Sequence, residues 1–182
     1  YASIDNSPVI YEFQSSGSNS VDVNSSLTGA WNSIQHGNSE QNNLTSPQIH
    51  STGASDGLYY WQVRAIDAAG NHSNWSEIWT VTLDTQAPQT PVLVSPDDGI
   101  FTKGASVTNV WSDTSTDIAY YNYESYKDAN LQNLRWNGTF TTTSKTATNV
   151  ADATFWWRVQ AVDFAENKSG WSGAWKITVD NT

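Results

Sequence analysis

The chain has 182 residues, a net charge of −10 and neither cysteine nor methionine. The acidic balance disfavours binding to nucleic-acid phosphates and to anionic membranes, and the lack of cysteine excludes disulfides and thiolate metal sites. No apolar run has the length of a membrane span, and the missing initiator methionine indicates a mature fragment or an excerpt of a longer polypeptide.

The first half opens with a strand candidate and continues into a long polar region. Residues 9–13 form the strand candidate, whereas residues 14–47 are poor in large apolar side chains and rich in Ser, Asn and Gly. We expect this polar insertion to be a tolerated loop, with residues 30–34 as a strand-like island. Residues 48–52 then predict a further strand.

A hairpin follows, and the chain contains it twice. Residues 59–84 and 155–180 align without a gap at an offset of 96 and are identical at 12 of 26 positions, including all three Trp. Each copy has two stretches of period-2 alternation around a turn rich in Asp, Gly and Asn. The sequence therefore predicts a duplicated β-hairpin with one aromatic face, and two domains of ordinary sandwich size.

Two prolines in residues 85–91 predict a semi-rigid linker between a first domain at 1–84 and a second domain at 92–182. The second domain begins with strand candidates at residues 91–94 and 107–111. Nothing before residue 9 matches these two strands.

The hairpin motif is aromatic-x-x-x-Val-x-Ala-x-Asp-x-x-Gly-Asn-x-Ser-x-Trp-Ser. It resembles strands F and G of a fibronectin type III-like repeat, and more narrowly it is similar to the tandem Ig-like or fibronectin-like repeats of long bacterial surface and secreted proteins. The resemblance implies an all-β fold of two tandem β-sandwiches. It also makes Tyr59 a tyrosine corner, whose hydroxyl bonds back to nearby backbone, while Phe155 in the second copy cannot make that bond.

In the family pattern, residues 9–13 are strand C, because residues 11–12 match residues 123–124. The first sandwich then lacks its N-terminal strands A and B, which leaves apolar surface and an open sheet edge exposed. In a rival alignment, residues 9–13 are strand B and the polar insertion contains strand C.

Oxygen ligands at repeated turns and domain ends are candidates for calcium binding, as in bacterial and cadherin-like arrays. These candidate ligands are Asp67, Asn71, Asp163, Asn167 and Asp84. The alternative, which we favour, is that Asp and Asn side chains cap their own turns. No cofactor other than calcium is predicted.

The Trp excess suggests glycan binding, since flat aromatic faces suit sugar rings. Most of the ten Trp lie in the duplicated hairpin, so only Trp31 and Trp136 are candidate glycan ligands. A core or loop-anchoring role is the favoured alternative for both.

The sequence predicts no catalysis, because the three histidines lack metal-ligand spacing and no serine lies in a nucleophile elbow. We expect a non-catalytic structural or adhesive module of an extracellular, bacterial-type cell-surface or secreted protein, which spaces or presents other domains. Its expected partners are neighbouring repeats or subunits of the same protein. The alternatives are a filament subunit assembled by strand donation into the incomplete first domain, and a carbohydrate-binding accessory module.

Overall fold

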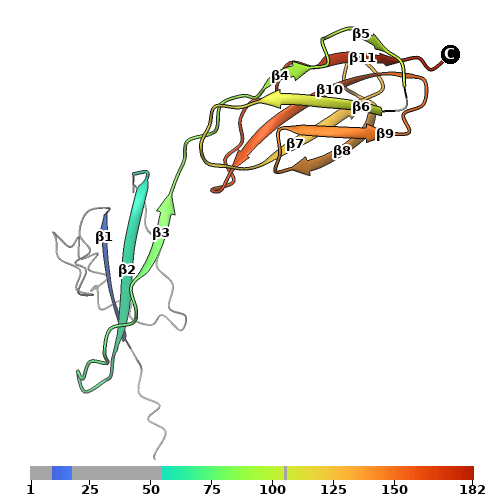
Figure 1. Cartoon of the computed structure of the whole chain (residues 1–182). Helices are drawn as coiled ribbons and strands as arrows, with labels where there is room; N and C mark the ends of the chain where they lie inside the picture. Colours follow the sequence, from blue (N-terminus) through green and yellow to red (C-terminus); the bar gives the residue numbers. More distant parts are fainter. Residues whose placement is uncertain (1–9, 18–54, 105) are drawn as a thin grey trace, which may run out of the picture. The chain divides into compact units, whose positions relative to one another are not determined.

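A computed structural model describes residues 10–17, as backbone, together with residues 55–104 and 106–182. The chain divides between Asp84 and Thr85 into a first unit and a second unit. Every helix or strand in the described residues is a β-strand, and Figure 1 labels each one. None of these residues belongs to a helix long and apolar enough to cross a membrane.

The second unit is a sandwich of two sheets. A five-stranded sheet has the order β5-β11-β10-β7-β8, and a three-stranded sheet has the order β4-β6-β9. The strands are β4 (Val92–Ser95), β5 (Ile100–Thr102), β6 (Ser106–Ser112), β7 (Ile118–Tyr126), β8 (Leu134–Phe140), β9 (Ser144–Thr148), β10 (Ala153–Asp163) and β11 (Trp175–Val179). All neighbours pair antiparallel except β5 and β11, which are parallel.

The core of the second unit lies between the two sheets and follows from period-2 alternation. In β6, buried Val107, Asn109 and Trp111 alternate with exposed or half-buried neighbours. In the central strand β10, the buried inward side chains are Phe155, Trp157, Val159 and Ala161. The Trp157 ring stacks on Tyr123 of β7 with 5.7 Å between ring centroids, so aromatic packing joins neighbouring strands of the large sheet.

The first unit contains a three-stranded antiparallel sheet. Its strands are β1 (Ile10–Gly17), β2 (Gly57–Ile66) and β3 (Trp79–Leu83), in the order β1-β2-β3. This order reproduces β7-β10-β11 of the second unit, so β1 occupies the place of strand C. The rival alignment is wrong, because the strand B equivalent, β6, lies in the other sheet and does not pair with β10.

The predicted residue match within strand C is wrong by two positions. Tyr11 pairs with Ala65, and Tyr121 pairs with the equivalent Ala161, so Tyr11 corresponds to Tyr121 instead of Tyr123. A shift of two residues leaves every side chain on the same face of the sheet. The alternation of apolar residues therefore could not distinguish the two registers.

The predicted polar insertion begins too early. Residues 14–17 belong to β1, where Gln14 pairs with Gln62 and Ser15 with Trp61. The strand candidates at residues 30–34 and 48–52 lie outside the described residues and stay predictions.

The end of the predicted linker contacts the second unit. The Gln89 N–H donates a 2.9 Å hydrogen bond to Ser115 Oγ, and Pro91 is buried. The segment before β4 is therefore held by the sandwich that it introduces.

Candidate functional site

Two serines of the first hairpin serve as partners for strand β2. Val63 N–H donates to Ser76 Oγ at 3.0 Å, while Ser76 N–H donates to the Val63 carbonyl at 2.8 Å. Ala65 is bound in the same way by Ser73, with both distances 2.9 Å. Each serine satisfies both backbone groups of one strand residue, so the segment after the turn is fixed without forming a regular strand.

The second hairpin repeats this arrangement. Ser172 binds the backbone of Val159 at 3.0 and 2.8 Å, and Ser169 binds that of Ala161 at 2.9 and 3.0 Å. Both serines are buried here. The Ser-x-Trp-Ser part of the duplicated motif is therefore explained by backbone hydrogen bonding.

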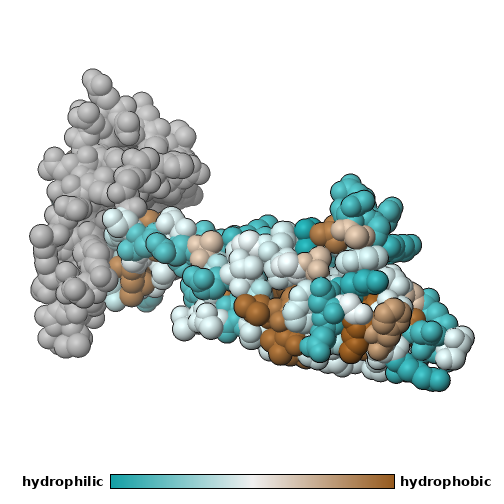
Figure 2. Space-filling model, turned by 90° about the horizontal axis from the view of Figure 1, so that it is seen from above, coloured by the Kyte–Doolittle hydropathy of each residue, from teal (hydrophilic) through white to brown (hydrophobic). Residues whose placement is uncertain are grey.

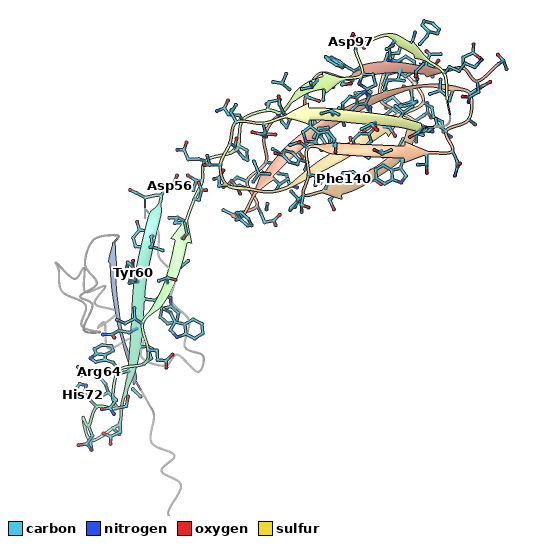
Figure 3. The ribbon with its side chains drawn as sticks, in the orientation of Figure 1. Asp56, Tyr60, Arg64, His72, Asp97 and Phe140 are labelled. Carbon is cyan, nitrogen blue, oxygen red and sulfur yellow. The ribbon has the colours of Figure 1, made fainter. Side chains whose placement is uncertain are left out.

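The Trp of the same motif stacks on an arginine in each unit. The Arg64 guanidinium lies 4.5 Å from the Trp75 ring centroid, and Arg158 lies 4.3 Å from Trp171. Figure 3 shows Arg64 projecting from β2 close to the labelled His72 of the following turn. The two arginines are not at aligned positions, because Arg158 aligns with Gln62. Aligning the two copies therefore did not predict the Arg–Trp stacking. The sequence does contain one indication of it: the two arginines differ by two positions in the alignment, which places them on the same face of the strand.

Arg158 also forms an ion pair on the outer face of the second unit. Its Nη2 lies 2.7 Å from Glu124 Oε2, and its Nε donates to the same oxygen at 2.9 Å. Tyr126 Oη donates to Glu124 as well, at 2.5 Å. Both charged side chains are only about one-fifth exposed, so this network is partly shielded from solvent and links β10 to β7 on this face of the sheet.

The predicted calcium ligands of the first turn bind their own backbone. Asp67 Oδ1 accepts the N–H groups of Ala69 at 2.9 Å and Asn71 at 2.8 Å, and Oδ2 accepts Asn71 Nδ2 at 2.8 Å. The side-chain bond from Asn71, followed by its backbone N–H, lowers the pKa of Asp67 from its ordinary value. This geometry favours the turn-capping alternative.

The second turn is built in the same way. Asp163 accepts N–H groups of Ala165 and Asn167, each at 2.8 Å, and the Asn167 amide at 3.0 Å. Glu166, which replaces Gly70, keeps the left-handed conformation, with φ of 67° against 82°. The turn is thus retained despite the substitution.

The remaining acidic groups add little to a metal site within one unit. Asp84 is the last residue of the first unit. Oxygens of Asp117 and Asp163 lie within 4.8 Å of each other in the second unit. Both carboxylate oxygens of Asp163, however, already accept hydrogen bonds within its own turn. Calcium prefers six to eight oxygen ligands, and the turn geometry does not converge such a set. Calcium binding stays a prediction.

Trp136 lies on β8, an edge strand of the five-stranded sheet. It is 41% exposed, and its ring covers Gly138, where an added Cβ would come within 2.4 Å of the ring. The ring packs 5.8 Å from Tyr123, and Lys145 Nζ lies 4.7 Å from its centroid. Burial lowers the pKa of Lys145. The structure brings Trp136 to the surface, whereas Trp31 lies outside the described residues.

Surface hydrophobic groups differ between the units. In the second unit they are scattered, and Figure 2 shows brown patches separated by teal hydrophilic atoms. They comprise Val92, Val94, Phe101, Leu134, Trp136 and Phe164. In the first unit, Trp79 and Val81 are 60% and 53% exposed on one face of β3, and the Trp79 ring lies 5.8 Å from Trp61.

The predicted tyrosine corner is confirmed. Tyr59 Oη donates a 2.7 Å hydrogen bond to the Ser55 carbonyl, four residues upstream. Phe155 occupies the equivalent position in the second unit without a hydroxyl. Of the histidines, His72 is exposed just after the turn, where it forms an isolated β-bridge with Ile66, while His36 and His50 are outside the described residues.

Comparison with known proteins identifies one curated relative. Over 149 residues the chain is 28% identical to the tip attachment protein J of Escherichia phage SECphi27. The match covers 71% of this chain and 12% of the length of that relative. No protein-family model matches the chain.

Solved structures resemble the fold. The fibronectin(III)-like modules of Clostridium thermocellum CbhA are 16% identical, with a TM-score of 0.55 over 97% of this chain and 80% of that one. The FN1–FN3 domains of chicken CNTN1 are 14% identical, with a TM-score of 0.60 over 96% of this chain and 56% of that one. The chain therefore has a fibronectin type III-like β-sandwich fold, as the hairpin motif indicated.

Proposed function

We propose that this chain is a non-catalytic structural module of a long extracellular or virion-surface protein, in which it spaces or presents other domains. The proposal rests on one observation: in both units, the polar side chains around the repeated motif interact with other groups of their own unit and so stabilise the fold. Serine hydroxyls bind strand backbone, turn carboxylates bind turn N–H groups, and arginines stack on tryptophans. A repeated unit whose polar side chains are already bonded within the unit is suited to a structural role as a spacer between domains.

The comparisons support the same class of protein. The phage relative is named a tip attachment protein, and this chain matches a small part of it, as a repeat within a long structural protein does. The fibronectin type III-like fold hosts many functions, so the fold alone carries no activity. An extracellular or surface location is part of this proposal.

A filament subunit assembled by strand donation is the second candidate. Exposed Trp79 and Val81 on β3 favour it, because a strand donated by another chain pairs at a sheet edge and covers apolar side chains beside that edge. A carbohydrate-binding module is the third candidate, favoured by the exposed ring of Trp136.

One set of measurements on the purified 182-residue chain separates the three candidates. Light scattering gives a monomeric mass for a spacing module and a polymer for a self-assembling subunit. A glycan panel read by Trp fluorescence gives no saturable change for a spacing module. A saturable change that disappears in Trp136→Ala would support the carbohydrate candidate and contradict our proposal.

A further inference from the structure

Two cationic side chains of the second unit lie over aromatic rings. Lys145 Nζ of β9 lies 4.7 Å from the Trp136 ring centroid and 4.9 Å from that of Tyr123. The Arg135 guanidinium of β8 lies 4.8 Å from the ring centroid of buried Phe155. Among the side chains that the structure describes, no acidic residue forms an ion pair with either cation. This is unexpected in a chain with 18 Asp and Glu against 8 Lys and Arg.

The acidic residues of the adjoining β7–β8 hairpin are bonded elsewhere. Glu124 pairs with Arg158, and Asp128 accepts three backbone N–H groups of its own loop. Burial, and then the positive charge of Arg135, lower the pKa of Lys145. The two cations therefore repel each other at a partly buried site, and an anion bound between them would relieve that repulsion.

A buried polar neighbour of Lys145 adds a further donor. Asn109 pairs directly opposite Lys145 across β6 and β9, so the two side chains are neighbours on one face of the sheet. Asn109 is 1% exposed, and its Oδ1 accepts a 3.4 Å hydrogen bond from Tyr123 Oη. Its Nδ2 has no partner among the described residues, and an unpaired buried donor is costly. Burial raises the pKa of Tyr123, so its hydroxyl keeps its proton and remains a donor.

We propose that these groups form a binding site for a carboxylate that carries an apolar group. Lys145, Arg135 and Asn109 Nδ2 lack an acceptor in the described part of the chain, and all three are donors, whereas an ionised carboxylate is only an acceptor. A carboxylate also carries a single charge, so it costs less to desolvate at a partly buried site than a doubly charged phosphate. The site is additional to the spacing role, and its ligand class differs from that of the glycan candidate.

The exposed ring of Trp136 supplies the contact for the apolar group. An added Cβ at Gly138 would come within 2.4 Å of this ring, so glycine leaves the space in which the ring lies against its own strand. The ring also packs 5.8 Å from Tyr123 and 5.9 Å from Phe140. The apolar part of the site is therefore preformed, which lowers the entropy cost of binding. Residue 105, the one undescribed position of this unit, precedes β6.

The test uses the full 182-residue chain and two probes of nearly the same shape, N-acetylphenylalanine and its neutral amide. Binding is followed by NMR, through the indole N–H of Trp136 and the backbone N–H of Lys145. The acid is expected to bind saturably. The amide is expected to bind at least about tenfold more weakly, because it offers the two cations no ionised acceptor.

A third probe, phenylacetate, distinguishes two sources of the carboxylate. Equal affinity for phenylacetate and N-acetylphenylalanine is expected if the ligand is a small organic acid. Tighter binding of N-acetylphenylalanine is expected if the ligand is the C-terminus of a peptide. Both results support a carboxylate site.

Variants assign the binding to the cations. Lys145→Gln is expected to weaken binding of the acid by at least about tenfold and to leave binding of the amide unchanged. Arg135→Gln is the second variant, with the same expected direction. Lys168→Gln makes the same charge change on an exposed side chain after β10 and is the matched control. The signals of β10 and β11 in the same spectra show whether each variant is folded.

Four results would overturn the inference. These are no saturable binding of the acid, equal binding of acid and amide, unchanged binding by a folded Lys145→Gln, and tighter binding of inorganic phosphate than of the acid. None of them changes the monomeric mass or the glycan panel. A failure of this inference is therefore distinguishable from a failure of the proposed function.

Discussion

The two hairpins of this chain have closely similar sequences and different environments. Ile177 is completely buried in the second unit, whereas Val81 at the equivalent position is 53% exposed. Local geometry is nevertheless the same, including the serine bonds and the capped turns. The comparison teaches that the hairpin motif encodes its own local structure, while burial depends on what packs against it.

The largest expected effect on stability comes from replacing the two aligned tryptophans, Trp61 and Trp157, one at a time. Trp157→Ala is expected to destabilise the second unit by about 3–5 kcal/mol, because it opens a cavity in a closed core. Trp61→Ala is expected to destabilise the first unit by roughly 1–2 kcal/mol, since its ring is only partly removed from water. Urea unfolding, followed by hydrogen exchange in β10 and β2, measures both. Equal losses would show that the two faces are equally covered.

The serine pair gives the next largest effect. Ser172→Ala is expected to cost about 1–3 kcal/mol, because it leaves the buried Val159 N–H without its acceptor. Ser76→Ala is expected to cost about 1 kcal/mol or less, because its part-buried site lets water replace the hydroxyl. The same unfolding measurement applies, and a larger loss at Ser76 would contradict this ranking.

The tyrosine corner distinguishes the units by a single hydroxyl. Tyr59→Phe is expected to cost about 0.5–1.5 kcal/mol, the net value of one hydrogen bond. Tyr60→Phe, on the opposite face of β2, is the control and is expected to change little. Thermal unfolding of the first unit, followed by exchange in residues 57–66, separates the two variants. Equal effects would mean that the corner bond is not what matters.

The smallest expected effect is acid sensitivity of the exposed turn. The folded-state pKa of Asp67 is lowered, so its contribution is present above the unfolded pKa of about 3.9 and is lost as pH falls through the folded value. In Asp67→Asn, protection of the Asn71 N–H from hydrogen exchange is expected to depend less on pH in the acid range than in the unchanged chain. The exposed Asp97→Asn serves as control, and an unchanged acid profile in Asp67→Asn would refute the assignment.

Much of the fold could be predicted from the sequence because it depends on local alternation and turn chemistry. The duplicated hairpin, strand C and the tyrosine corner are of this kind. The two-residue register of β1 could not be predicted, since both registers place the same side chains on one face. The Arg–Trp stacks and the position of the Trp136 ring over Gly138 depend on three-dimensional neighbours that alternation does not encode.

The serine bonds have one more consequence, for repeats held close together in one array. Unsatisfied strand edges on neighbouring copies are templates for aggregation. Strand β2 continues beyond its last pair with β3, and this part includes Val63 and Ala65. The hydroxyl and backbone of Ser76 bind the backbone of Val63, and those of Ser73 bind the backbone of Ala65, so this edge is already occupied. Side chains from the same hairpin thus protect this stretch against mispairing with a sister repeat, at no cost in added strands.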